Sequence, residues 1–228
     1  MPAVLNARSR RRVVAAAIHR AWRWAERNGA LTPDDGHGFR SFGAASMLAF
    51  PPGDVFGAWW ISIGSQSLCA PGVSLSVGMP TEVLDRRSPV VVDIGDRVFI
   101  GRGSSVVGRV GIVIEDDVTI APNVYVTDHN HAYGDVEVPI GAQYPVAAPV
   151  RIGAGSWLGV GVVVLPGTTI GRHVTVAAGS VVRGDVPDHS VVAGSPAAVV
   201  RRWSAAGGWS PPLPPSDTVI PPDWPTRS

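Results

Sequence analysis

The stretch V-R-I-G-A-G-S-W-L-G-V-G-V-V-V-L-P-G-T-T-I-G-R-H-V-T-V, residues 150–176, places an aliphatic residue at every sixth position from Ile152 onward. A period of six matches neither the 3.6-residue period of a helix nor the simple alternation of one long strand. Three short strands per turn explain it, if each strand ends at a corner where a small residue permits the bend. Successive coils would then stack about 4.8 Å apart, the spacing of neighbouring strands. The stretch therefore predicts an all-β fold, a parallel β-helix with its aliphatic residues pointing inward.

The same repeat covers most of the chain. Its aliphatic positions are Ile94, Ile100, Val106, Ile114, Ile120, Val126, Ile152, Leu158, Val164, Ile170, Val176 and Val182. A two-residue offset follows Val106, and Ile61 marks an earlier turn in weaker register. We expect an N-terminal helix and linker at residues 1–40 and a β-helix domain at 41–202 with a loop at 127–149. An extended tail is expected at 203–228, which contains seven prolines.

Residues 8–28 are predicted to form a helix, because their apolar residues follow the 3.6-residue period. We expect this helix to pack against the main domain with its arginines in solvent. Binding of the arginine-rich face to an anionic membrane surface is the alternative. No window reaches 18 apolar residues, so no transmembrane segment is expected, and the apolar run after Arg12 is too short for an export signal.

Composition excludes some classes of function. The formal net charge is +1, which provides no general field to attract nucleic acid. The single cysteine, Cys69, excludes an internal disulfide and is typical of a reducing compartment. We therefore expect a cytoplasmic protein that does not bind nucleic acid, in which Cys69 is a small buried side chain rather than a nucleophile.

The repeat is interrupted by D-H-N-H-A-Y, residues 128–133. The core positions Val126 and Ile152 lie 26 residues apart, which is not a multiple of six, so this segment must leave the prism and rejoin it. The two histidines lie at the start of the loop, where the rigid coils can hold their geometry. Histidine pairs in loops are commonly just solvated, but at this position they suit general base catalysis near neutral pH.

Several motifs together resemble the hexapeptide-repeat O-acetyltransferases. They are A-P-N-V at 121–124, the histidine-bearing loop, P-V-R-I-G-A-G-S-W-L-G at 149–159 and A-G-S-P-A at 193–197. Their order is similar to the galactoside and maltose acetyltransferase branch, and D-H-N-H-A-Y is closer to enzymes that acetylate polysaccharide sugars. The resemblance implies a left-handed β-helix, a homotrimer, acetyl-CoA as co-substrate, no metal, and a small-molecule or saccharide acceptor.

The resemblance also implies roles for individual residues. His129 would be the general base of a direct acyl transfer. The acceptor side would be formed by Asp128, Asn130, His131 and Tyr133, with Asp128 either orienting the imidazole of His129 or capping the loop. The CoA contacts would be Trp157, Val160, Ala177, Ala178, Arg183 and Arg201. Val160 and Ala198 depart from this pattern, since the family often has serine and arginine there, and Arg202 is the candidate replacement for the missing arginine.

Two other classes share the fold. The gamma-type carbonic anhydrases hold zinc with three histidines contributed by two subunits, and they need histidines beyond one H-x-H. Here the other histidine within the repeats is His173, which is expected to be exposed at a corner. A non-catalytic β-helix scaffold is the third possibility, and CoA binding would distinguish it from the acyltransferase.

Overall fold

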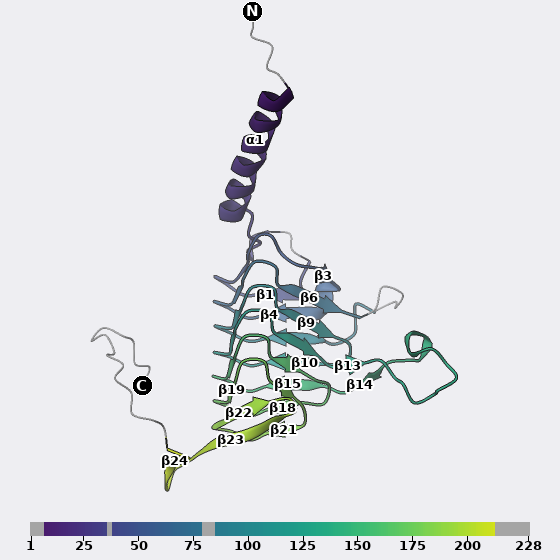
Figure 1. Cartoon of the computed structure of the whole chain (residues 1–228), viewed down its shortest axis with the longest axis vertical. Helices are drawn as coiled ribbons and strands as arrows, with labels where there is room; N and C mark the ends of the chain where they lie inside the picture. The colour runs from purple at the N-terminus through teal and green to yellow at the C-terminus, as the bar shows by residue number, and fades with distance from the viewer. Residues whose placement is uncertain (1–6, 36–37, 79–84, 213–228) are drawn as a thin grey trace, which may run out of the picture.

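The structure is a computed structural model that describes residues 7–35, 38–78 and 85–212 (Figure 1). Helix α1, Ala7–Asn28, is followed by short strands that wind into a triangular prism with three parallel sheets as its faces. The first face contains β1 Ser41–Phe42, β4 Ile61–Ile63, β7 Val92–Ile94, β10 Ile112–Ile114, β15 Val150–Ile152, β18 Thr169–Ile170 and β21 Asp185–Val186. The chain passes from the first face to the second, then to the third, and back to the first one coil later.

The other two faces are built in the same way. The second face contains β2 Met47–Leu48, β5 Leu68–Cys69, β8 Phe99–Ile100, β11 Thr119–Ile120, β16 Trp157–Leu158, β19 Thr175–Val176 and β22 Ser190–Gly194. The third face contains β3 Val55–Phe56, β6 Ser74–Val77, β9 Ser105–Gly108, β12 Tyr125–Thr127, β17 Val163–Val164 and β20 Val181–Val182. A short 3₁₀ helix, η1 Ala58–Trp60, connects the first coil to the second.

The aliphatic ladder read from the sequence forms the core. All twelve predicted positions are buried, and each stacks on its equivalent in a neighbouring coil, as in the parallel pairs Ile114 with Ile152 and Ile152 with Ile170. Burying each such side chain contributes about 1.5–3 kcal/mol. The two-residue offset after Val106 lies at Arg109–Gly111, the tight turn between β9 and β10.

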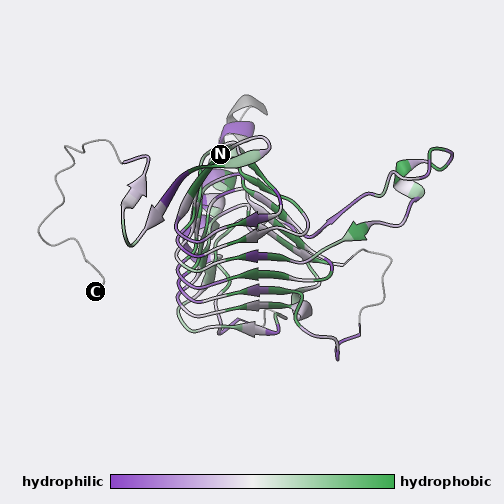
Figure 2. Ribbon diagram, turned by 90° about the horizontal axis from the view of Figure 1, so that it is seen from below, coloured by the Kyte–Doolittle hydropathy of each residue, from purple (hydrophilic) through white to green (hydrophobic). Residues whose placement is uncertain are grey.

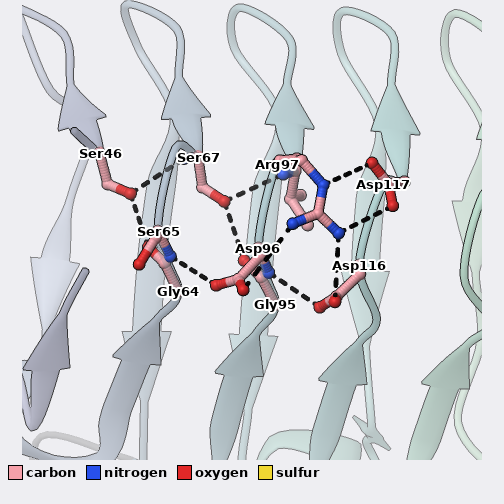
Figure 3. Close-up of polar contacts among 10 residues, drawn as sticks. Ser46, Gly64, Ser65, Ser67, Gly95, Asp96, Arg97, Asp116 and Asp117 are labelled. Carbon is pink, nitrogen blue, oxygen red and sulfur yellow. Dashed lines mark hydrogen bonds and ion pairs between the residues drawn. The ribbon is translucent and has the colours of Figure 1, made fainter. Parts of the chain in front are cut away.

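The edge between the first and second faces needs a left-handed residue in every coil. The residues there are Ala45, Gln66, Arg97, Asp117, Gly155, His173 and His189, with φ between 52° and 69°. Acidic side chains of one coil bind the backbone of its neighbour: Asp96 accepts from the N–H of Ser65, and Asp116 from that of Asp96 (Figure 3). Hydrogen bonds to Asp117, with Asp116 and Asp96 nearby, raise the pKa of the Arg97 guanidinium above its ordinary value. This polar ladder accompanies the small corner residues predicted from the sequence, since a Cβ at Gly64, Gly95, Gly153 or Gly171 would lie within 2.6 Å of the next coil.

Helix α1 confirms the predicted helix, but the expected packing against the domain is wrong. From Arg11 to Asn28 every residue except Ala25 is exposed, and the helix projects from one end of the prism (Figure 1). The ring of Trp22 meets that of Phe50 edge-on at 5.4 Å between centroids. No helix in the described parts of the chain is long and apolar enough to cross a membrane.

The C-terminal end differs from the expected tail. Strand β23, Ala197–Ser204, pairs antiparallel with β22 and then with β24, Gly208–Ser210. The boundary expected after residue 202 therefore falls inside a strand, and residues 213–228 lie outside the described part of the chain. This hairpin and the loop after β12 leave the prism on opposite sides (Figures 1 and 2).

Candidate active site

The interrupting segment is a loop on the edge between the third and first faces. It leaves the prism after β12 and returns at β15. Its neck is a two-stranded antiparallel ladder of β13, His129–Asn130, and β14, Val146–Ala147. The far part of the loop contains the 3₁₀ helix η2, Ile140–Ala142. The predicted site is therefore at the root of the loop, beside the coils.

Asp128 is fully buried at this root, and both of its carboxylate oxygens accept backbone hydrogen bonds. The N–H of Arg109 lies 2.9 Å from Oδ1 and Oδ2, and the N–H groups of Val110 and Gly111 each donate to Oδ2 at 2.7 Å. These three donors belong to the tight turn of the preceding coil. The carboxylate therefore fastens the loop to the rigid body, and its burial is compensated by hydrogen bonds.

The same carboxylate orients His129. Oδ1 of Asp128 lies 3.0 Å from Nδ1 of the imidazole, and the side chain of His129 is 17% exposed. Since the carboxylate already accepts the backbone N–H groups, it acts as an acceptor toward the ring, and this network assigns the proton to Nδ1. Nε2 then has the free electron pair, and among the described residues it has no hydrogen-bond partner. A neutral imidazole held in this way can accept a proton.

The backbone of His129 is fixed on both sides. The buried hydroxyl of Thr127 donates to the carbonyl of His129 at 3.1 Å and accepts from its N–H at 3.3 Å. His129 pairs with Ala147 across the neck, and the N–H of Ala148 donates to the carbonyl of Asp128 at 2.8 Å. The imidazole therefore projects from a backbone that three separate contacts hold in place.

The other residues predicted on the acceptor side have different surroundings. Asn130, His131 and Tyr133 are exposed on the loop, and the side chain of Tyr133 is 79% exposed. Asp128 does not fit the predicted substrate contact, because it is inaccessible and its oxygens are already occupied. Of the alternatives the sequence left open, orienting the histidine and capping the loop both hold for this one carboxylate.

The residues predicted to contact CoA are split between parts of the prism. Trp157 and Arg201 share one column on the second face, where parallel and antiparallel pairs connect Trp157 to Thr175, Thr175 to Val191 and Val191 to Arg201. Trp157 is 48% exposed. The guanidinium of Arg201 donates to the carbonyls of Pro211 and Pro212, so the predicted phosphate contact is in use within the chain.

The remaining predicted CoA contacts lie on two edges. Val160, Ala177 and Ala178 lie on the edge between the second and third faces, where Ala178 stacks directly against Gly159 of the coil before. Arg183 follows β20 on the edge between the third and first faces, two coils after the root of the loop. It is exposed and lies on the same edge as His129, apart from the other five residues.

Sequence reasoning missed the backbone donors of Arg109, Val110 and Gly111, and the hydroxyl of Thr127. The phase offset after Val106 was the available signal, since it marks an irregular corner. Arg109 also places its guanidinium 4.8 Å from the centre of the Tyr144 ring, which connects this corner to the far part of the loop. Among the described residues, no group of three or more His, Cys, Asp and Glu side chains converges in a way that could hold a metal ion.

Two family descriptions match the coils on either side of this loop. Residues 91–128 match the hexapeptide repeat of succinyl-transferase, and residues 149–184 match the bacterial transferase hexapeptide of six repeats. The coils of this chain are therefore similar to the hexapeptide repeats of bacterial transferases, and the β-helix has the left-handed winding of that fold.

Curated relatives match the same region. The chain is 35% identical over 120 residues to the galactoside O-acetyltransferase of Escherichia coli, covering 50% of this chain and 58% of that protein. It is 34% identical over 128 residues to Escherichia coli WbbJ, named provisionally as a lipopolysaccharide biosynthesis O-acetyl transferase, covering 53% and 65%. A probable acetyltransferase of Mycobacterium tuberculosis is 41% identical over 116 residues, covering 49% and 39%. The chain thus spans less than two thirds of the length of each of these relatives.

A solved structure shares the fold. It is a mutant of AntD, an N-acyltransferase from Bacillus cereus, in complex with dTDP and coenzyme A. The TM-score is 0.61 at 19% identity, covering 74% of this chain and 87% of that one. At this identity the likeness concerns the arrangement of the coils.

Proposed function

We propose that this chain is an acetyl-CoA-dependent O-acetyltransferase that acts on a hydroxyl group of a sugar or a glycosylated acceptor. The observation that carries the proposal is the chain of contacts from the backbone of Arg109–Gly111 through Asp128 to Nδ1 of His129. These contacts leave Nε2 of His129 free to act as a base at the start of the loop. The curated names of the matching relatives support the acetyl group and the hydroxyl acceptor.

The proposed reaction is a direct transfer. Nε2 of His129 accepts the proton of the acceptor hydroxyl while the oxygen attacks the thioester carbonyl of acetyl-CoA. The tetrahedral intermediate collapses, the carbon–sulfur bond breaks, and the imidazolium returns the proton to the CoA thiolate. Asp128 stabilises the imidazolium and keeps Nδ1 protonated, so the ring presents the same nitrogen in each cycle. No covalent enzyme intermediate is needed.

We propose that the complete site forms between two copies of the chain. His129 lies on the edge between the third and first faces, whereas Trp157 lies on the second face, which is opposite that edge in a triangular prism. One copy alone therefore does not bring the base to Trp157 or to the other proposed CoA contacts that lie away from this edge. A homotrimer with parallel prisms places an edge of one copy beside a face of the next. Light scattering tests this, and a monomer that transfers acetyl groups would contradict it.

The acceptor side is proposed to include Asn130, His131 and Tyr133, which are exposed beside the base. Their amide, imidazole and phenol groups supply both hydrogen-bond donors and acceptors, and the ring of Tyr133 offers an apolar face suited to a sugar ring.

The test is mass spectrometry of the full chain with acetyl-CoA and a panel of free sugars, nucleotide sugars and oligosaccharides. We expect one acceptor to gain a single acetyl group in a reaction that releases free CoA. The matched control is the His129→Ala variant under the same conditions. A panel acetylated equally by both proteins, or stoichiometric zinc with carbonic anhydrase activity in the wild type, would overturn the proposal.

A further inference from the structure

Helix α1 has an apolar stripe that the described chain leaves largely uncovered, apart from the contact of Trp22 with Phe50. Successive residues of a helix are turned by about 100°, so the apolar residues of α1 fall within about half of its circumference. These residues are Val13, Val14, Ala17, Ile18, Ala21, Trp22, Trp24 and Ala25. The exposed fractions are 55% for Val13, 61% for Ile18 and 67% for Trp24. A stripe of this width normally packs on a core, yet here it faces outward.

The opposite side of α1 is strongly basic, because five of the seven arginine positions lie there, and Arg10 and Arg11, near the start of the helix, fall within the apolar arc. The helix contains seven arginines and one glutamate, and no acidic residue in its first turn. It therefore carries six net positive charges, although the whole chain carries one. The glutamate, Glu26, accepts a hydrogen bond from the indole N–H of Trp22 at 2.9 Å. Positive charge is thus concentrated on an element that stands away from the prism (Figure 1).

We propose that α1 is a membrane-surface anchor that binds an anionic lipid bilayer, lying in its interface with the apolar stripe toward the acyl chains. An apolar stripe that contains tryptophan, opposite a face of arginines, is the pattern of helices that lie in a membrane interface. Each arginine near an anionic surface adds about 1 kcal/mol of attraction. This function goes beyond acetyl transfer and does not depend on it.

A second copy of the helix is a poorer occupant of the stripe. Helices packed side by side would bring together elements with six net positive charges each, and Glu26 is the one acidic residue available for pairing between them. The apolar stripe also contains several alanines, which bury little area against another helix. Both features favour the charge complementarity of an anionic surface.

The test measures how the full chain partitions onto vesicles, without acetyl donor or acceptor. We expect binding to vesicles of equal parts phosphatidylglycerol and phosphatidylcholine, weaker binding as salt increases, and none to pure phosphatidylcholine. Reversing three charges together, in Arg20→Glu, Arg23→Glu and Arg27→Glu, should lower the partition coefficient more than 100-fold, at about fivefold for each charge removed. The control Arg172→Glu, at an exposed corner of the prism, should leave the partition coefficient unchanged.

A matched pair of variants tests the apolar stripe at constant charge. Ile18→Asp lies on the stripe and Ala16→Asp on the basic side, and both positions are exposed. We expect about a tenfold or greater loss of vesicle binding for Ile18→Asp and less than half of that loss for Ala16→Asp. Equal losses, equal binding to neutral vesicles, or capture by duplex DNA as strong as by vesicles would overturn the proposal. A lower molar mass of Ile18→Asp in light scattering would assign the stripe to a second copy instead.

Discussion

Two successive turns on the edge between the third and first faces differ, and the difference shows how this fold positions the candidate base. After β9 the chain turns within Arg109–Gly111, and its three N–H groups have no strand partner. After β12 it leaves as a loop of some twenty residues, and the first loop residue, Asp128, supplies the acceptor those N–H groups lack. The tight turn is thus completed by the loop, and the loop is positioned by the tight turn.

The stacked core of the coils, which supports both turns, is tested first by Ile170→Asp, for which we expect the largest effect. An unpaired carboxylate in the stacked core, with no hydrogen-bond partner, costs several kcal/mol and disrupts the coils on both sides. We expect loss of the cooperative thermal transition measured by circular dichroism. Thr169→Asp, whose side chain is exposed on the neighbouring position, is the control and should melt like the wild type. A cooperative transition at the wild-type temperature in Ile170→Asp would contradict the predicted register.

The proposed general base at the start of the loop is tested by His129→Ala. Removing a general base lowers kcat about 10²–10⁴-fold, while the partly exposed imidazole contributes little to folding. The measurement is steady-state acetyl transfer together with a thermal melt. The companion variant His131→Ala, on the exposed part of the loop, should change KM for the acceptor more than kcat. If His131→Ala were the inactive variant, the base would have to be reassigned.

The contact between the tight turn and the loop is tested by Asp128→Asn. The amide cannot satisfy all three backbone donors and also accept from Nδ1 of His129, because one of its two polar atoms is itself a donor. We expect kcat to fall about 10²-fold and the melting temperature to fall by several degrees, since hydrogen bonds to a charged group contribute about 1.5–3 kcal/mol. Asp135→Asn, further out on the same loop, should leave both quantities unchanged. A loss of activity with no loss of stability would show that the turn does not need this carboxylate.

A smaller effect is expected on the second face, opposite the loop. Trp157→Ala should raise KM for acetyl-CoA about tenfold with little change in kcat, because a contact to the non-reacting part of a substrate contributes to binding alone. Phe99 lies in the same column two coils earlier and is a matched control, connected to Trp157 through Thr119. An unchanged KM in Trp157→Ala, or an equal change in Phe99→Ala, would separate CoA from this part of the face.

Cys69 should show no reaction at all. Burial raises the pKa of its thiol to about 12, so the thiol stays neutral below that pH and lacks the nucleophilic thiolate. Iodoacetamide at pH 8 should label the unfolded chain and leave the native chain unlabelled, as measured by intact mass. Labelling of the native protein at the rate of a free thiol would mean that the early coils open readily.

The local repeat of the coils could be predicted from the sequence, whereas the relative placement of distant residues could not. The six-residue period predicted the coils, the inward positions and the place of the loop, because every short strand has the same pattern of buried and exposed positions. It also pointed to the segment with His129 and His131, since a polar run that breaks such a period stands out, and the choice of His129 came from the family resemblance. That Trp157 lies on the face opposite the edge of His129 could not be predicted from the sequence, because the number of corners between the two residues was fixed only by the structure.

The amino-acid sequence by itself determined the β-helix and the twelve core positions, because these depend on neighbours a few residues apart, and it singled out the segment that contains the candidate base His129. Tertiary structure decided the role of Asp128, the exposure of helix α1 and the strand pairing after residue 197. Asp128 binds N–H groups that lie 17 to 19 residues earlier, and only the stacking of coils brings them together. The sequence shows that helix α1 is amphipathic but not what its apolar stripe packs against. The structure shows that the stripe does not pack on the core of the prism.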